Sequence, residues 1–149
     1  MPAGSIVRLQ SRDLERLENL LRSNHLPTED CVEQAQNFYG IFDEDDLVAA
    51  AGLEPAANYA LLRSVVVQER YRDRGLARVL SEFLINQADS AGKKAVYLLT
   101  ETAETYFENL GFSNVDRAQV PLEIMQTRQF TTLCPDTASC MILTLSANR

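Results

Sequence analysis

The sequence predicts one α/β domain in which helices flank a mixed sheet of parallel and antiparallel strands. Three observations favour this fold class. The chain of 149 residues suits a single hydrophobic core. Three β-rich segments between residues 37 and 67 follow one another closely, which is typical of antiparallel neighbours. From Gly75 onward, apolar residues recur with a helical period before the next strand, as in a parallel crossover.

The first part of the chain predicts one strand followed by two helices. Residues 5–10 carry Ile6, Val7 and Leu9 with Arg8 between them and suit a short strand. The first helix can be capped by Ser11 or Asp13, and its buried stripe consists of Leu14, Leu17, Leu20 and Leu21. Thr28 is expected to cap a second short helix that runs to about Gln34.

The middle of the chain predicts three strands in succession. They are expected at residues 37–42, 47–54 and 60–67, where aromatic, small and β-branched residues gather. The acidic run Asp43–Asp46 lies between the first two of these segments. We interpret it as a solvated hairpin turn.

The rest of the chain alternates helices and strands. A helical stripe ends at Gly92, which suits the C′ position after a helix, and its members are Leu76, Leu80, Phe83, Leu84 and Ala88. The remaining elements are expected as a strand at 95–99, a helix at 102–110, a strand at 112–115, a short helix from Pro121 and a strand at 139–145. The resulting order is β-α-α-β-β-β-α-β-α-β-α-β in one domain over residues 1–149.

Composition excludes several classes of function. Lys and Arg number 14 against 21 Asp and Glu, so the net charge of −7 disfavours general binding to nucleic acid. No apolar run approaches the roughly 20 residues of a membrane span, and no signal peptide is visible, so we expect a cytoplasmic protein without a membrane partner. The chain's one histidine excludes a multi-His metal site, and its three cysteines are no disulfide framework.

The segment after the third of these middle strands carries the chemistry. Arg70, Arg72 and Arg74 concentrate positive charge in an otherwise acidic chain, and Gly75 follows at the start of a helix. A helix start leaves about four N–H groups unpaired and carries partial positive charge, which suits a phosphate. Gly75 allows the backbone close to a ligand, and Ala77 keeps the first turn narrow. We therefore predict a pyrophosphate cradle built mostly from main chain.

Two common phosphate motifs are absent from this segment. No Gly-Lys-Ser/Thr follows, so it is no Walker A loop, and no G-x-G-x-x-G is present, so it is no Rossmann fingerprint. The alternative interpretation is a solvated basic loop in front of a core helix.

The segment resembles the acetyl-CoA-binding signature of the GNAT N-acetyltransferase superfamily. The matching residues are Arg72-Asp73-Arg74-Gly75-Leu76-Ala77 after Val65-Val66-Val67, with Tyr106-Phe107-Glu108-Asn109-Leu110-Gly111-Phe112 similar to the second motif. Within this superfamily, four segments of the chain resemble the branch associated with arsenic-resistance operons. They are Gly52-Leu53-Glu54, Leu61-Leu62-Arg63-Ser64, Tyr97-Leu98-Leu99-Thr100 and Leu133-Cys134-Pro135. The element order agrees with this GNAT acyl-CoA N-acyltransferase-like fold over almost the whole chain.

The resemblance implies acetyl-CoA as co-substrate, with no metal. Main-chain groups of Val65 and Val67 would pair with the pantetheine arm, and the N–H groups from Arg72 to Ala77 would hold the pyrophosphate. The strand at 61–67 and the strand at 96–99 would splay apart around the thioester. A main-chain N–H near Val65, Val66 or Val67 would polarise the thioester carbonyl, as an oxyanion hole does.

Candidates for proton transfer lie in the second motif and at or just after the ends of the strands expected at 47–54 and 95–99. Many members of the superfamily use a tyrosine four residues before the glycine of the Leu-Gly-Phe motif, where this chain has Phe107. Either Tyr106, one residue earlier, or water is then expected to protonate the thiolate. Glu54 is the first candidate for the base, and Glu101 is its rival; each could equally be an exposed loop carboxylate.

Three further positions are candidates for contacts with a substrate. Arg63 lies within an apolar strand, so it either pairs with an acid such as Glu54 or binds an acceptor anion. His25 lies in the segment that caps the acceptor site in this superfamily, although a lone loop histidine is more often plain surface. Cys134 and Cys140 could bind trivalent arsenic, but small core or turn residues are the favoured interpretation.

These observations predict an N-acetyltransferase that moves the acetyl group of acetyl-CoA directly to the amine of a small molecule. The resemblance suggests an amino-acid-like or organoarsenical acceptor. The missing tyrosine at Phe107 keeps open an alternative, a non-catalytic CoA-binding module or sensor. A third hypothesis is a redox or metalloid sensor based on Cys134 and Cys140. The apolar final strand, with Met141 and Ile142, suits either the core or the contact of a homodimer.

Overall fold

The computed structural model describes residues 5–133 and 137–145. Its strands are β1 (Ile6–Arg8), β2 (Phe38–Asp43), β3 (Asp46–Ala56), β4 (Tyr59–Val67), β5 (Ala95–Thr100), β6 (Ser113–Asn114) and β7 (Ser139–Thr144). Its α-helices are α1 (Leu14–Ser23), α2 (Leu76–Ser90), α3 (Glu104–Glu108) and α4 (Leu122–Met125). Short 3₁₀ turns and one π-helical turn, Gln129–Leu133, complete the described elements.

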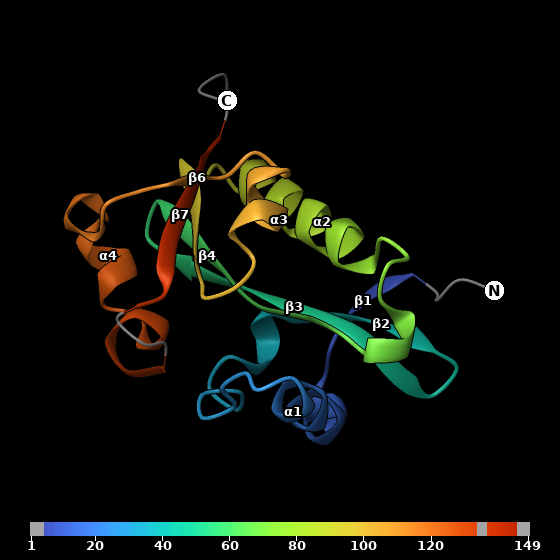
Figure 1. Cartoon of the computed structure of the whole chain (residues 1–149). Coiled ribbons are helices and arrows are strands. Elements are labelled where there is room, and N and C mark those ends of the chain that lie inside the picture. The colour runs from blue at the N-terminus through green and yellow to red at the C-terminus, as the bar shows by residue number, and fades with distance from the viewer. Residues whose placement is uncertain (1–4, 134–136, 146–149) are drawn as a thin grey trace. The chain divides into compact units, whose positions relative to one another are not determined.

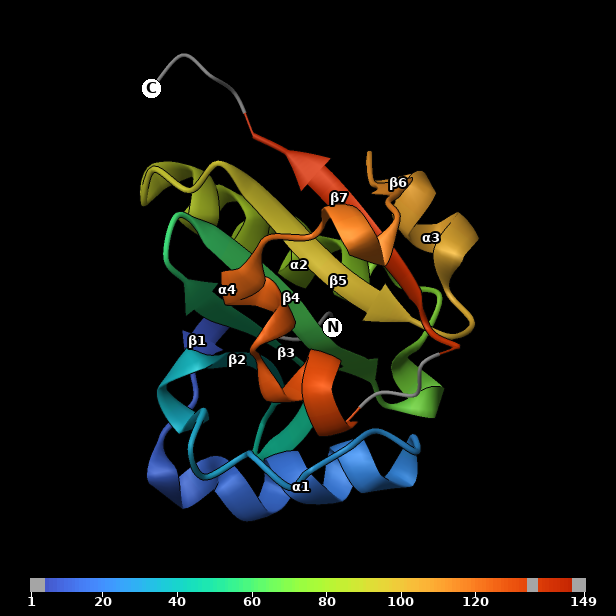
Figure 2. The same ribbon diagram turned by 90° about the vertical axis from the view of Figure 1, so that its left-hand side faces the viewer.

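The strands form a mixed sheet, which confirms the predicted fold class. Within the described residues, seven strands follow the order β1-β2-β3-β4-β5-β7-β6. The pairs β1–β2, β2–β3, β5–β7 and β6–β7 are antiparallel, whereas β4 and β5 run parallel across the crossover through α2. Figures 1 and 2 show these strands together with the helices.

The chain divides into two compact units, and β3, β4 and α2 contribute residues to both. Unit 1 comprises Met1–Leu53 and Ser64–Leu84, and unit 2 comprises Glu54–Arg63 and Ile85–Arg149. The expectation of a single domain over 1–149 stays a prediction. No helix in residues 5–133 or 137–145 has the length and apolar character that a membrane crossing requires.

The core of unit 1 lies on both faces of β2. Phe38 is fully buried and belongs to a cluster with Leu17 and Leu21 of α1, whose predicted leucine stripe is confirmed. The next residue, Tyr39, points to the opposite face, where its ring meets that of Phe83 on α2 at a centroid distance of 5.4 Å. The alternation of β2 therefore places α1 and the first part of α2 on opposite sides of this strand (Figure 1).

The core of unit 2 joins α4 to the face of β5 and β7. Ile124 of α4 is fully buried in a cluster with Tyr97 of β5 and Cys140 of β7. Figure 2 shows α4 in front of this part of the sheet. At the end of α2, Gly92 has φ +80°, and the N–H of Lys93 donates to the carbonyl of Ala88 at 3.0 Å. This is the predicted C′ glycine.

The second predicted helix, from Thr28 to about Gln34, is wrong. This segment forms a series of turns and ends in a 3₁₀ turn, Ala35–Asn37. Its buried side chains are those of the adjacent Asp30 and Cys31, while Val32 is 70% exposed. A continuous helix needs apolar residues three or four apart, and this segment lacks that spacing.

A glycine in β2 offers a test of the packing in unit 1. A Cβ at Gly40 would lie 2.7 Å from Cδ1 of Leu47 and 2.9 Å from Cδ2 of Leu9, which is closer than real carbon contacts. Because both leucines would have to move, we expect Gly40→Ala to lower the free energy of unfolding by about 1–3 kcal/mol. Chemical denaturation measures this change.

The matched control is Val7→Ala. Val7 is the registered partner of Gly40 on β1 and is 43% exposed. Its truncation should change the free energy of unfolding by less than about 1 kcal/mol. A Gly40→Ala variant as stable as the wild type would contradict the close packing at β2.

Candidate functional site

The connection between β4 and α2 places a run of unpaired amides at a helix start. Asp73 and Gly75 have φ +65° and +80°, so the chain turns through the left-handed region twice before α2 begins. Among the described residues, none accepts a backbone hydrogen bond from the N–H groups of Asp73–Ala77. We call residues 73–77 the amide loop. An ideal Cβ at Gly75 would meet nothing within 4 Å, so the space above this backbone is open to a ligand.

The amide loop is one residue shorter than the predicted cradle. The N–H of Arg72 donates to the carbonyl of Glu69 at 3.2 Å, because a 3₁₀ turn, Glu69–Tyr71, precedes the loop. Arg72 was expected to contribute its amide to the cradle, and this hydrogen bond occupies it. The 3₁₀ turn at Glu69–Tyr71 removes the Arg72 amide from the cradle. The residue pattern alone does not reveal this turn.

The three arginines of this segment have partners within unit 1. Arg70 forms an ion pair with Asp46 at 3.3 Å, and Arg74 donates to the carbonyl of Arg70 at 3.3 Å. Arg72 donates from Nε to the carbonyl of Val67 at 3.2 Å and from Nη2 to Oδ1 of Asn24. These contacts tie the arginines to the fold, so the ligand-binding capacity of the segment lies mainly in the main-chain amides.

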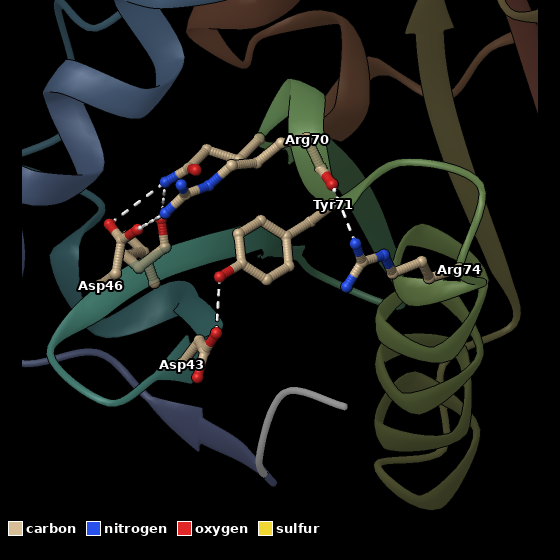
Figure 3. A network of polar contacts seen from close by, with 7 residues as sticks. Asp43, Asp46, Arg70, Tyr71 and Arg74 are labelled. Atoms are coloured by element: carbon tan, nitrogen blue, oxygen red, sulfur yellow. Dashed lines mark hydrogen bonds and ion pairs between the residues drawn. The ribbon is translucent and has the colours of Figure 1, made fainter. Parts of the chain in front are cut away.

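Tyr71 connects this segment to the hairpin of β2 and β3. Its hydroxyl donates to Oδ2 of Asp43 at 2.5 Å, and its side chain is buried (Figure 3). The guanidinium carbons of Arg70 and Arg74 lie 5.3 Å and 5.1 Å from the centre of its ring. The hydrogen bond to Asp43, together with burial, raises the pKa of Tyr71, so the hydroxyl remains a donor at neutral pH.

The interpretation of Asp43–Asp46 as only a solvated turn is therefore wrong for its two ends. Asp43 and Asp46 are registered partners at the end of the hairpin, and only Glu44 and Asp45 between them form the exposed turn. Asp46 also accepts from Nε2 of Gln68 at 3.1 Å. The missed signal was charge complementarity between this acidic run and the arginine segment.

The C-terminal part of β4 has an irregular backbone. Ser64 has φ +57° inside the strand, a conformation that interrupts regular pairing. Val66 is buried in the unit 1 core, and the carbonyl of Val67 accepts the hydrogen bond from Arg72, so this main-chain acceptor has a partner. Within unit 2, the pairing of β4 with β5 extends only from Tyr59↔Ala95 to Leu61↔Tyr97, although both strands continue.

Glu54 and Arg63 form a buried ion pair in unit 2. Nη1 of Arg63 lies 3.2 Å from Oε1 of Glu54, and the two side chains are 0% and 13% exposed. The structure thus brings about the first of the two alternatives expected for Arg63. Removal of one partner from such a pair is costly, because it leaves the other charge buried.

The other candidates lie at less enclosed positions. Tyr106 of α3 is 37% exposed, and its ring meets that of Phe107 at 5.2 Å; Phe107 itself is buried. Glu101 is exposed just after β5. His25, with φ +62°, is exposed and lines a cavity of about 880 Å³ in unit 1, which Arg70 and Arg72 also line. No residue pattern predicts that His25, Arg70 and Arg72 share a cavity.

The cysteines have contrasting positions. Cys31 and Cys140 are buried, with 0% and 4% of their surface exposed. Burial raises the pKa of Cys140 to about 11. Cys134, the other half of the suggested arsenic pair, lies outside the described residues. No cluster of three His, Cys, Asp or Glu side chains suited to a metal ion occurs in the described ranges.

Comparisons with known proteins agree with this geometry. Residues 5–112 match the sequence model of the acetyltransferase (GNAT) family. The fold is similar to that of Rv2747 from Mycobacterium tuberculosis in complex with CoA, with 17% identity, a TM-score of 0.81, and coverage of 96% of this chain and 100% of that one. It is also similar to N-acetylglutamate synthase from Neisseria gonorrhoeae complexed with coenzyme A and N-acetyl-glutamate, with 17% identity, a TM-score of 0.84, and coverage of 98% of this chain and 36% of that one. For the ribosomal-protein-S18-alanine N-acetyltransferase from Escherichia coli, the identity is 21%, the TM-score 0.75 and the coverage 97% and 96%.

The buried thiol of Cys140 is expected to react slowly in the native protein. A raised pKa leaves only about a thousandth of a thiol as reactive thiolate at pH 8, against roughly a quarter for an unperturbed cysteine. Iodoacetamide should therefore modify Cys140 about a hundredfold more slowly in the folded chain than in guanidinium. Peptide mass spectrometry measures both rates, with Cys140→Ser as the control for peak assignment. Equal rates in the two states would contradict the burial of this thiol.

Proposed function

Because the chain belongs to the GNAT acetyltransferase family, we propose that it transfers the acetyl group of acetyl-CoA directly to the amine of a small molecule. The observation that carries this proposal is the amide loop: five successive N–H groups, Asp73–Ala77, without backbone partners among the described residues, at the start of α2 and within the part of the chain that matches the family. Such a set of donors and the helix dipole suit the charges of a pyrophosphate.

The main chain of β4 would hold the rest of the co-substrate. We assign the pyrophosphate of acetyl-CoA to the amides of Asp73–Ala77 and the pantetheine arm to the main chain of Val65 and Val67. The short register of β4 with β5, which ends at Leu61 although β4 continues to Val67, supports this assignment. An N–H near Val65–Val67 would stabilise negative charge on the thioester oxygen.

The acceptor ammonium must lose two protons, one before it attacks and one to water as the amide forms, and sulfur must gain one. In our proposal Glu54 accepts the first proton through water and is held in place by Arg63. The neutral amine then attacks the thioester carbonyl, the C–S bond breaks, and the CoA thiolate leaves. Tyr106 or water protonates this thiolate, since Phe107 carries no proton to give. Glu101 is the rival base.

For the acceptor we propose an amino-acid-like molecule, an organoarsenical among them. Support comes from the motifs that resemble the arsenic-resistance branch, and His25 is the proposed substrate contact, whereas Arg63 is occupied by its ion pair with Glu54. The net charge of −7 favours cationic acceptors during encounter. We further propose a cytoplasmic homodimer in which Ile142 and Leu143 of β7, half-buried in one copy, take part in the contact.

One observation favours a second candidate function. Phe107 is buried at 7% exposure in the position where many family members carry a tyrosine acid. A non-catalytic CoA-binding module would need no proton donor there. Such a module binds acetyl-CoA but accelerates acetylation of no amine in a broad panel.

The proposal predicts that calorimetry detects binding of acetyl-CoA and no comparable binding of adenosine. Gly75→Ala should weaken the affinity for acetyl-CoA about tenfold or more, because a methyl group would cover the amides and the left-handed backbone would be strained. Gly92→Ala is the matched control: Gly92 also has φ +80° and open space around it, but it lies at the other end of α2. Its affinity should equal that of the wild type. Equal or absent binding of the two ligands would overturn the proposed co-substrate.

The base assignment predicts a separate effect of Glu54→Gln. An amide keeps an acceptor for Arg63 but takes up no proton, so turnover should fall about a hundredfold or more while the acetyl-CoA affinity stays within about twofold. An assay of thiol release over a panel of amino acids, polyamines and aminoglycosides first identifies the best acceptor. Glu101→Gln and Tyr106→Phe are compared on the same acceptor, with thermal unfolding as the check on folding. Unchanged turnover in Glu54→Gln would show that Glu54 is not the base.

A further inference from the structure

The amide loop lacks internal support for its shape. Asp73 and Gly75 both adopt left-handed backbone, and for Asp73 this conformation costs energy that a glycine would not pay. The N–H groups of Asp73–Ala77 contribute no backbone hydrogen bond within the described part of the chain. The conformation of the loop must therefore be fixed from outside, at its ends. Its C-terminal end continues into α2, where the N–H of Val79 donates to the carbonyl of Gly75 at 3.0 Å.

The N-terminal end of the loop is fixed by the β2–β3 hairpin. Three side chains of the preceding segment bond to two aspartates: Tyr71 to Asp43, and Gln68 and Arg70 to Asp46. We call these five residues the hairpin anchor. Figure 3 shows Asp43 and Asp46, from the two ends of the β2–β3 turn, facing Tyr71 and Arg70 of the segment just before the amide loop.

Tyr71 is the member of the hairpin anchor closest to the loop. It lies two residues before Asp73, its side chain is only 9% exposed, and its hydroxyl bond to Asp43 is the shortest contact of the set at 2.5 Å. Hydrogen bonds to an ionised carboxylate are stronger than neutral ones. Arg74, inside the loop, lies with its guanidinium carbon 5.1 Å from the ring and donates to the carbonyl of Arg70. The tyrosine therefore contacts the loop through Arg74, one residue beyond Asp73.

The negative charge of Asp43 does not suit a direct role in holding a phosphate. A carboxylate close to a pyrophosphate would repel it, so Asp43 must have a role other than contact with the ligand. Its hydrogen bond to Tyr71, with Arg70 and Arg74 against the same ring, gives one: the carboxylate stabilises the donor network rather than the ligand.

We propose that Asp43 and Tyr71 are positioning residues for the co-substrate, because their hydrogen bond holds the amide loop in the shape that binds the pyrophosphate of acetyl-CoA. This inference rests on the proposed function and extends it to two residues outside the family signature quoted above. The hairpin anchor acts through the backbone of residues 73–77 and touches no reacting atom. Loss of the bond should therefore weaken the co-substrate's binding without removing a group that takes part in the chemistry.

The test compares Tyr71→Phe, Asp43→Asn and the double variant in calorimetric binding of CoA. Tyr71→Phe removes the donor, and we expect it to weaken CoA binding about tenfold. Asp43→Asn keeps an amide oxygen that accepts from Tyr71 but loses the charge that strengthens the bond, so its effect should be smaller, about threefold. Because both act on the same hydrogen bond, the double variant should bind CoA within about twofold of Tyr71→Phe. Measurements are made at 10 °C, far below thermal unfolding, with circular dichroism confirming that every variant is folded.

Two controls separate positioning from general stability. Asp45→Asn removes the same charge from the exposed turn of the same hairpin and should bind CoA like the wild type. Gly92→Ala strains the left-handed backbone at the far end of α2 and should lower the melting temperature of the protein. It should nevertheless retain full affinity for CoA. A merely structural bond between Tyr71 and Asp43 would lower the melting temperature of its variants and leave the affinity for CoA unchanged.

The outcomes distinguish this inference from the proposed function. Weaker binding confined to the Tyr71 and Asp43 variants supports it. Wild-type affinity in both single variants overturns it and leaves the proposed function intact. Failure of the wild-type chain to bind CoA overturns both.

Discussion

The structure depends on the way β4 turns into α2. A strand that leads into a helix must end its ladder and start a new set of hydrogen bonds, and the first amides of that helix have no partner by geometry. Here the chain adds two left-handed residues, Asp73 and Gly75, and the amides of Asp73–Ala77 make no backbone hydrogen bond within the described residues. The same turn that ends β4 therefore creates the donors of the candidate site. Its shape cannot come from the ladder or from the helix alone.

Several neighbouring elements fix the position of this turn. α1 and the first part of α2 pack on opposite faces of β2 through Phe38 and Tyr39, which fixes the hairpin that carries Asp43. The hairpin then reaches the segment before the loop through Tyr71. Burial of leucines in the core of unit 1 is thus linked, through β2 and one phenolic hydroxyl, to the position of backbone amides. Apolar packing supplies the stability, and the polar contacts supply the geometry.

The sequence predicted those features that depend on local periodicity and on residues with special backbone freedom. The leucine stripe of α1, the C′ role of Gly92 and the open position of Gly75 follow from such rules. The helix expected from Thr28 failed because a capping residue without a buried stripe does not make a helix. The contacts of Asp43 with Tyr71, 28 residues apart, could not be predicted, because long-range pairing of charged or polar groups leaves no period in the chain.

A net charge of −7 is compatible with an anion site, because surface charges and amide dipoles act over different distances. Surface carboxylates are screened by salt beyond roughly 10 Å, whereas amide dipoles act over a few ångströms. Of the arginines near the loop, Arg70 is paired with Asp46, whereas Arg72 and Arg74 bond to neutral oxygens and keep their positive charge beside the loop. The charge of Arg70 offsets that of Asp46, and the other two charges act together with the amide dipoles. An acidic chain can therefore keep its overall charge and still present, at one turn, a surface of donors to a phosphate.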